Sequence, residues 1–372
     1  MRRCPAGRLV LSALMVGAAG VLLCVAGFFV DSRAAMAAWL TAALAFAGLP
    51  LGALTILMVH GLTGGRWGEA MRPPLRAMAA TMPLALLLLL PVLVRLDLVF
   101  PWAGDTALLP AKVQAKLAYL NAPFFLARFA ACAAVWLGLA WLVLGWTAPP
   151  GRSSGRGHAV GLILHGIAVS VFSIDWMLSL EPGFVSTVYA MTEASAQTVG
   201  AGALALVVLV AGRQVEIRPG SDGVSPGEDV ANMLFGFLLT WAYLAFMQWL
   251  VVWAGDLPDE IHWYLLRMRG GWQYLMLAAI LTGFAIPFAG FLSRRLKRTH
   301  AGLLWLGILV GAGHFLETAW RIRPPLGGVG LLSGWHDLAA FAGAGGLWTA
   351  LFLFFLDAPE RLALRRGRLA HG

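Results

Sequence analysis

Ionisable side chains lie inside long apolar stretches of this sequence, and their types and positions could support chemistry. Arg128, Asp175, Glu193, His314 and Glu317 are each surrounded by mainly apolar runs. Carboxyl and imidazole groups held in such surroundings are typical of proton relays. An arginine paired with a carboxylate can also hold helices together without any transport, so both roles are open for these residues.

Two polar stripes follow helical spacing. Residues three or four positions apart lie on the same face of a helix. The stripes are His314, Glu317 and Arg321 in one segment and Tyr189, Glu193 and Gln197 in another. We expect both stripes to face the interior of a helix bundle.

The composition indicates that these segments cross a membrane. Hydrophobic residues make up 60% of the 372 positions, charged residues make up 12%, and the mean hydropathy is +0.78. Charged residues make up roughly 25% of a typical soluble domain, so a water-facing shell cannot be built from this sequence. The sequence therefore predicts an all-α polytopic membrane protein with a single integral membrane domain over residues 1-372.

About ten segments are long enough to cross roughly 30 Å of hydrocarbon at about 1.5 Å per residue. The polar breaks between them are loops, and none is long enough to be a further domain. The predicted transmembrane helices lie near residues 9-30, 35-60, 76-95, 122-146, 159-179, 186-211, 230-253, 272-293, 301-321 and 337-356.

Basic residues mark one side of this ten-helix arrangement. With ten spans, both termini and alternate loops share one side, which carries 18 of the 27 Lys and Arg residues, while the opposite side carries 8. The positive-inside rule therefore predicts a bacterial inner-membrane protein with cytoplasmic N- and C-termini. The net charge of +9 comes from short gaps between apolar runs, so it indicates a lipid bilayer and not a nucleic-acid partner.

This orientation gives each ionisable residue a depth. Arg128 and Glu193 lie about 10 Å below the outer surface at the rise of an α-helix, and Asp175, His314 and Glu317 also fall in the outer half. Five groups from four predicted helices therefore share one layer. Glu193 has no cationic residue close to it in sequence, which favours a functional role, whereas capping at the interface is an alternative for Asp175.

Other polar residues extend this layer or form a thinner inner group. Tyr243 and Gln248 lie in the outer half of the seventh span, and His60 and His165 lie nearer the inner surface. His165 could be a relay or a hydrogen-bonded core residue. A proton route would need a connection between the two groups.

The two longest outer loops, residues 96-121 and 254-271, are rich in aromatic side chains. Such residues are typical of the belt at a membrane surface, and short amphipathic helices on the membrane would explain both loops. A docking surface for a partner is the alternative. The aromatic residues in or next to these loops are Trp102, Tyr119, Trp263, Tyr264 and Trp272.

The sequence offers little for cofactor chemistry. A bis-histidine haem needs two histidines at matching depth on facing helices, and His60, His165 and His314 do not match in depth. The cysteines form no disulfide or metal motif, and no phosphate-binding loop or catalytic triad stands in a suitable context. We therefore expect no catalytic residue, no metal site and no cofactor bound by this chain alone.

Two segments resemble a known family. The segment FSIDWMLSLEPGFVSTVYAM from Phe172 and the segment WAYLAFMQWLVVWAGDLPDEIHWYLLRMRGGW from Trp241 are similar to the ActF membrane subunits of bacterial alternative complex III. With the spacer between them they cover about a hundred residues, and the ten-helix arrangement agrees over the rest of the chain.

This resemblance implies a subunit related to the quinone-binding polysulfide-reductase membrane family, built as two four-helix bundles plus two peripheral helices. Such a subunit works in a quinol-oxidising complex whose substrate is menaquinone or ubiquinone. The partners implied are an iron-sulfur protein, a multihaem or monohaem cytochrome c, a sister quinone-binding membrane subunit and a terminal oxidase. ActF proteins carry no haem or cluster and are proposed to contribute a proton route.

Three hypotheses follow. The first is a cofactor-free membrane subunit of a quinol-oxidising respiratory complex, in which Glu193 and its neighbours form a proton-conducting or quinone-contacting polar site. The second is a structural scaffold whose polar groups only pair and whose outer loops dock redox partners. The third, ranked last, is an independent secondary transporter, which would need helices broken near the middle of the membrane. Such breaks could occur at Pro83, Pro91 and Pro287, although proline is also common in membrane helices that transport nothing.

Overall fold

The chain folds as a bundle of long helices. The computed structural model describes residues 6–145, 155–218, 223–327 and 334–357, and within these ranges it contains helices and no strand. Ten helical segments in the described ranges are long and apolar enough to cross a membrane. The prediction of an all-α polytopic membrane protein with ten spans is therefore confirmed.

The bounds of the helices place each predicted span on one observed helical segment. The ten spans are α1 (Ala6–Val30), α2 (Ser32–Thr63), α3 with α4 (Arg66–Ala79 and Met82–Val94), α6 (Ala122–Gly145), α7 (Gly155–Trp176), α8 (Tyr189–Ala211), α9 (Pro226–Ala254), α11 with the π-helical turn η5 and α12 (Trp272–Ile280, Leu281–Ala285 and Ile286–Leu292), α14 (His300–Ile322) and α15 (Trp335–Asp357). The short helices are η1 (Leu96–Leu98), η2 (Pro101–Ala103), η3 (Thr106–Leu108), α5 (Ala111–Gln114), η4 (Leu178–Leu180), α10 (Pro258–Arg267), α13 (Arg294–Lys297) and η6 (Pro324–Leu326).

The third span differs most from its predicted range, because it begins ten residues before the predicted start at 76. The first helix of this span, α3, carries basic residues, so the apolar run that predicts the span does not include it. The span is interrupted after Ala79, where Pro83 has no N–H to donate to the Ala79 carbonyl. The hydroxyl of Thr81 donates to the Met78 carbonyl at this break.

Helix starts follow from local capping. The carboxylate of Asp31 accepts from the backbone N–H of Ala34 and begins α2. At α9, Ser225 and Glu228 form a reciprocal capping box. These caps satisfy backbone donors at the ends of the spans, where the helix itself offers no partner.

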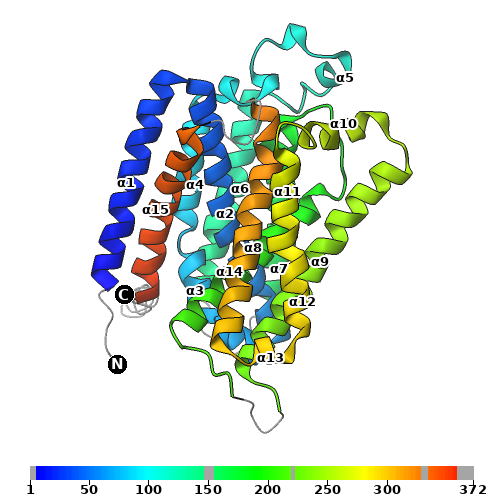
Figure 1. Cartoon of the computed structure of the whole chain (residues 1–372). Helices are drawn as coiled ribbons and strands as arrows, with labels where there is room; N and C mark the ends of the chain where they lie inside the picture. The colour runs from blue at the N-terminus through cyan, green and yellow to red at the C-terminus, as the bar shows by residue number, and fades with distance from the viewer. Residues whose placement is uncertain (1–5, 146–154, 219–222, 328–333, 358–372) are drawn as a thin grey trace.

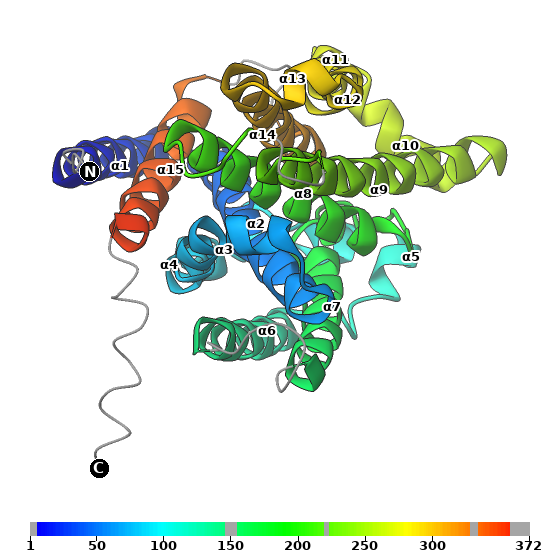
Figure 2. The ribbon, with the colours of Figure 1, turned by 90° about the horizontal axis from the view of Figure 1, so that it is seen from below.

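The spans form two bundles of four and one peripheral pair. Seen from below, α2, α3 with α4, α6 and α7 lie together, and α8, α9, α11 with α12 and α14 lie on the other side (Figure 2). The two bundles meet where α2 packs against α8. Helices α1 and α15 pack along each other at the edge, where Gly20 approaches Gly343 so closely that a Cβ on Gly20 would meet the Gly343 backbone.

Both ends of the described chain lie at the same end of the molecule. The start of α1 and the end of α15 are at the bottom of Figure 1, and α5 and α10 are at the top. We call the α5 and α10 end the outer end, following the charge bias of the loops. Part of that bias rests on basic residues outside the described ranges, namely Arg2, Arg3, Arg152, Arg361, Arg365, Arg366 and Arg368.

The outer loops contain short helices, but three of their tryptophans are not a surface belt. Trp102, Trp263 and Trp272 are 2%, 5% and 6% exposed. The Trp102 indole N–H donates to Ser179 at 3.1 Å, and its ring packs on Phe100. The expectation of membrane-surface aromatics is therefore wrong for these three residues, because the loops fold back over the bundles and bury them.

Candidate functional site

The outer half of each four-helix bundle contains buried charged side chains. In the first bundle Arg128 on α6 forms a bidentate ion pair with Asp175 on α7, with nitrogen–oxygen distances of 2.7 and 2.9 Å. Both residues are buried, at 9% and 2% exposure. One cation therefore meets one anion, and the pair is balanced in charge.

The Arg128 guanidinium has further partners on the outer loop. It donates to the Tyr119 carbonyl at 3.0 Å, and its Cζ lies 3.7 Å from the centre of the Tyr119 ring and 4.3 Å from that of Phe124. Burial and the neighbouring Asp175 raise the pKa of Tyr119 to about 12, so its phenol stays protonated at neutral pH. These contacts are those of a satisfied structural pair.

The second bundle contains a different arrangement, with two carboxylates on one arginine. Arg321 Nη2 lies 2.5 Å from Glu193 Oε2, and Arg321 Nε lies 3.4 Å from Glu317 Oε1. Glu193 comes from α8, whereas Glu317 and Arg321 lie on one face of α14. All three side chains are at most 6% exposed. We call Glu193, Glu317 and Arg321 the acidic cluster.

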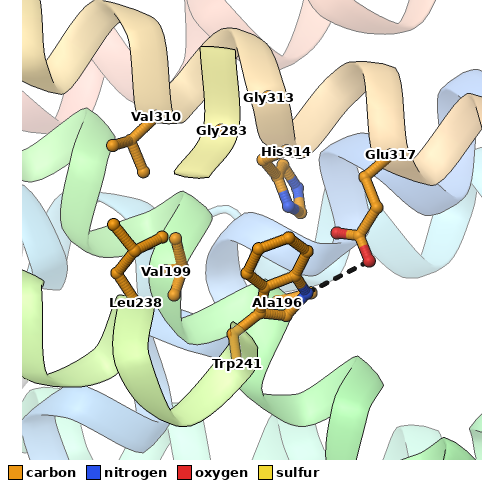
Figure 3. A pocket seen from close by; sticks show the side chains of 9 residues that line it. All are labelled: Ala196, Val199, Leu238, Trp241, Gly283, Val310, Gly313, His314 and Glu317. Atoms are coloured by element: carbon orange, nitrogen blue, oxygen red, sulfur yellow. Dashed lines mark hydrogen bonds between the residues drawn. The ribbon is translucent and has the colours of Figure 1, made fainter. Parts of the chain in front are cut away.

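Two neighbouring side chains donate to the acidic cluster. The Trp241 indole N–H on α9 donates to Glu317 Oε1 at 3.1 Å, as Figure 3 shows. Gln197 Nε2 donates to Glu193 Oε1 at 2.9 Å. The other polar atom of this amide, Gln197 Oε1, has no hydrogen-bond partner among the described residues. The Tyr189 ring lies 5.8 Å from Arg321 Cζ. The predicted stripes on α8 and α14 therefore do face each other inside the bundle.

His314 lies beside the acidic cluster, at the junction of the two bundles. Its Nε2 is 3.4 Å from the Ala45 carbonyl of α2, and its Nδ1 has no hydrogen-bond partner among the described residues. The ring fits against α8 only because residue 200 is glycine, since a Cβ there would lie 2.7 Å from His314 Cγ. His314 is 5% exposed, so its free nitrogen is buried.

A second ion pair covers the outer side of the acidic cluster. Arg267 on α10 lies 2.6 Å from Glu181 and donates to the backbone carbonyl of Arg321 at 2.7 Å. Its Cζ is 3.6 Å from the centre of the Trp263 ring. Burial lowers the pKa of Arg267 from its ordinary value, and Glu181 opposes that shift. Arg267 is 1% exposed and closes the cluster from the outer surface.

Sequence reasoning does not identify Arg267, Glu181 or Trp241 as site residues. Arg267 and Glu181 fall in predicted outer loops, and Trp241 has no ionisable group. Arg321 is predicted on the correct helix face but at the end of its span. The available signal is its position four residues after Glu317, which allows an ion pair on one helix.

The two inner histidines do not join the acidic cluster. His165 accepts from the Trp136 indole N–H at Nδ1 (3.1 Å) and contacts the Thr55 hydroxyl at Nε2 (2.9 Å). An Nδ1 that accepts is unprotonated, so both ring nitrogens are satisfied in the neutral state. His60 Nε2 lies 3.1 Å from the Gly65 carbonyl at the inner end of α2. Of the two roles left open for His165, this geometry favours the core residue.

The two remaining candidate residues, Gln248 and Tyr243 on α9, lie in different surroundings. Gln248 is buried and accepts from the Ser186 hydroxyl at 3.2 Å, near the start of α8. Tyr243 is 62% exposed and lies on the outward face of α9. The structure therefore divides the single predicted layer into the Arg128–Asp175 pair and the acidic cluster, with Tyr243 outside both.

A small cavity lies against the acidic cluster between α8, α9, η5 and α14 (Figure 3). Glu317, His314 and Trp241 are among its lining residues, and its volume is about 10 Å³. That space holds about one water molecule. No group of three or more His, Cys, Asp or Glu side chains among the described residues is arranged to hold a metal ion.

The charge of the acidic cluster determines what it can do. Two carboxylates and one guanidinium leave an excess of one negative charge at bilayer depth, where an uncompensated charge is costly. A proton on either carboxylate makes the cluster neutral. The arrangement can therefore take up and release a proton, whereas the balanced Arg128–Asp175 pair has no such need.

Comparison with known proteins identifies no relative. No protein-family model matches the chain, and no curated protein matches it. The function of the chain is therefore inferred from the geometry of its residues and from the resemblance of the two segments.

Proposed function

We propose that this chain is a cofactor-free membrane subunit of a quinol-oxidising respiratory complex, similar to alternative complex III, and that its acidic cluster conducts protons. The observation that carries the proton-conducting role is the sharing of Arg321 by two buried carboxylates, Glu193 and Glu317. A cluster that changes from charged to neutral by binding one proton is suited to passing protons through a membrane.

The size of the cavity favours protons over quinone at this cluster. About 10 Å³ beside Glu317 and His314 admits a water molecule and no ring of quinone size. Quinone is therefore not placed at this cluster. The resemblance assigns quinol oxidation to a sister membrane subunit, with menaquinone or ubiquinone as the substrate of the complex.

The proposed partners follow from the resemblance of the segments that begin at Phe172 and Trp241. They are an iron-sulfur protein, a multihaem or monohaem cytochrome c, a sister quinone-binding membrane subunit and a terminal oxidase. Purification in mild detergent tests this assignment, and we expect iron-sulfur and cytochrome subunits to accompany the chain. Purification of the chain alone would favour a secondary transporter instead.

The proposed location is a bacterial inner membrane with both termini in the cytoplasm. The supporting observations are the excess of basic residues in the loops at the inner end and the short basic helix α13 at that end. Labelling of single cysteines placed in α13 and in α10 by a membrane-impermeant reagent tests the orientation. Labelling of the α13 position in intact cells with a permeabilised outer membrane would contradict it.

A purely structural scaffold is the second candidate, and the Arg128–Asp175 pair favours it for the first bundle. The substitution Glu193→Gln separates the two functions, because it removes a proton site and keeps the shape of the side chain. We expect coupled proton movement to fall in the purified complex while the subunits remain assembled. Unchanged turnover and coupling would support the scaffold.

A further inference from the structure

The cavity beside Glu317 has an unusual wall. Its lining includes Gly283, which belongs to the π-helical turn η5, where the Ile286 N–H donates to the Leu281 carbonyl five residues earlier. Such turns are rare in proteins, and those that do occur often lie at functional sites. The backbone of this turn packs directly against α14. A Cβ on Gly313 of α14 would lie only 2.2 Å from the Gly283 Cα.

The π-helical turn also changes the backbone hydrogen bonding beside the cavity. Residue 287, four positions after Gly283, is proline and has no N–H. The Gly283 carbonyl therefore lacks the donor that a regular α-helix would supply.

His314 supplies one polar group to the cavity, and the contact of its ring with α2 favours one tautomer. The Ala45 carbonyl, 3.4 Å from Nε2, can only accept, so this contact favours the tautomer with the proton on Nε2. Nδ1 is then an acceptor in the neutral ring, and it has no hydrogen-bond partner among the described residues. The side chain points from α14 into the space beside Ala196 and Trp241 (Figure 3).

Glu317 supplies the second polar group. Trp241 and Arg321 both contact Oε1 of this carboxylate. Oε2 is therefore the oxygen that we assign to a ligand in the cavity. A buried water needs two to four polar partners, and Glu317 and His314 provide two beside a space of about one water.

We infer that the cavity binds one water molecule through Glu317 and His314, and that this water carries protons between these two side chains. The inference rests on the proposed proton-conducting function of the acidic cluster. In the transfer step, protonated His314 gives its Nδ1 proton to the water oxygen while the water gives one of its own protons to Glu317. The imidazole becomes neutral, the carboxylate becomes a carboxylic acid, and the water is regenerated.

Filling the cavity tests this inference. Ala196 lines the cavity, and Ala205 is an equally buried alanine on the same helix that does not line it. Ala196→Val and Ala205→Val therefore add the same volume to α8, the first inside the cavity and the second away from it. Both variants are compared with the wild-type chain, in the complex in which it purifies and in liposomes.

Two readouts separate binding of the water from its role. Infrared difference spectra after a pH jump, in ordinary water and in water labelled with oxygen-18, detect a buried water by its isotope-shifted O–H band. We expect Ala196→Val to lose this band and to slow proton transfer about tenfold or more, an effect of roughly 1.4 kcal/mol on the barrier. Ala205→Val is expected to keep both the band and the rate.

The outcomes distinguish this inference from the proposed function. Retention of the band or of the wild-type transfer rate in a folded Ala196→Val protein would overturn the inference while leaving the function intact. A wild-type transfer rate in Glu317→Gln would overturn the function itself, and the isotope-shifted band would still decide whether the water is bound. If Ala196→Val does not fold, Val199→Ile fills the same cavity by a single methyl group.

Discussion

The two bundles hold their buried charges in different ways. In the first, Arg128 and Asp175 form a one-to-one bidentate pair whose guanidinium is covered by Tyr119 and Phe124. In the second, Arg321 serves both Glu193 and Glu317. The first group is neutral as it stands, whereas the second becomes neutral only by binding a proton.

This difference is the basis for proposing a helix-packing role for the first group and a chemical role for the second. Desolvation penalises both groups, and a well-made pair offsets most of that cost. The acidic cluster keeps an uncompensated carboxylate, next to a histidine with a free nitrogen and a cavity the size of a water molecule. The predictions below test whether the two groups differ in this way.

The largest effect is expected at Arg321. The substitution Arg321→Leu leaves two carboxylates without their shared cation, and breaking a buried pair costs about 3–5 kcal/mol. We expect this loss in the free energy of unfolding, measured by denaturation in lipid nanodiscs. Arg269→Leu is the control, because Arg269 is an exposed arginine on the same end of the protein, and equal stability of the two variants would contradict the assignment.

Removal of one partner from the first group is expected to destabilise less than Arg321→Leu. Arg128→Leu leaves one carboxylate unpaired, and the double variant Arg128→Leu with Asp175→Leu removes both charges. Since replacing a whole buried pair by apolar residues is often neutral, the double variant should recover most of the stability that the single variant loses. Adding Glu193→Leu to Arg321→Leu should recover less, because Glu317 remains; equal recovery in both groups would remove the distinction.

A smaller effect is expected from moving His314. Gly200→Ala places a Cβ within 2.7 Å of the His314 ring, and overpacking of this kind costs about 1–3 kcal/mol. The expected result is a lower melting temperature together with slower proton transfer. Gly311→Ala is the matched control on α14, since a Cβ there meets nothing within 4 Å; a stability equal to that control would show that the ring is not held in this place.

The smallest effect is expected at Tyr243. This side chain is 62% exposed and lies outside both charged groups. Tyr243→Phe should change the unfolding free energy by no more than about 0.5 kcal/mol and should leave proton transfer unchanged. A marked loss of proton transfer would place Tyr243 in the route and would enlarge the acidic cluster.

The sequence predicts the helices and their polar faces because both depend on spacing along one chain. Apolar runs of sufficient length give ten spans, and the spacing of His314, Glu317 and Arg321 gives a shared face that the structure buries. The long outer loops are harder to predict, because Trp102 and Trp263 carry the composition of a surface belt but are buried by loop folding.

Pairing between helices cannot be predicted in the same way. Depth follows from position along a span, whereas the neighbours of a helix depend on how all ten pack around one another. Arg128 and Glu193 therefore fall into one predicted layer although they belong to different bundles. The partnership of Glu193 with Arg321 and the cover supplied by Arg267 appear only when α8, α10 and α14 are in place.

The most direct test compares isosteric substitutions in the two groups, Glu193→Gln and Asp175→Asn. Proton movement per quinol oxidised is measured in liposomes with the purified complex and expressed per folded complex. We expect Glu193→Gln to lower this ratio severely while Asp175→Asn lowers stability and keeps the ratio at the wild-type value. Equal ratios in the two variants would contradict the assignment of proton conduction to the acidic cluster.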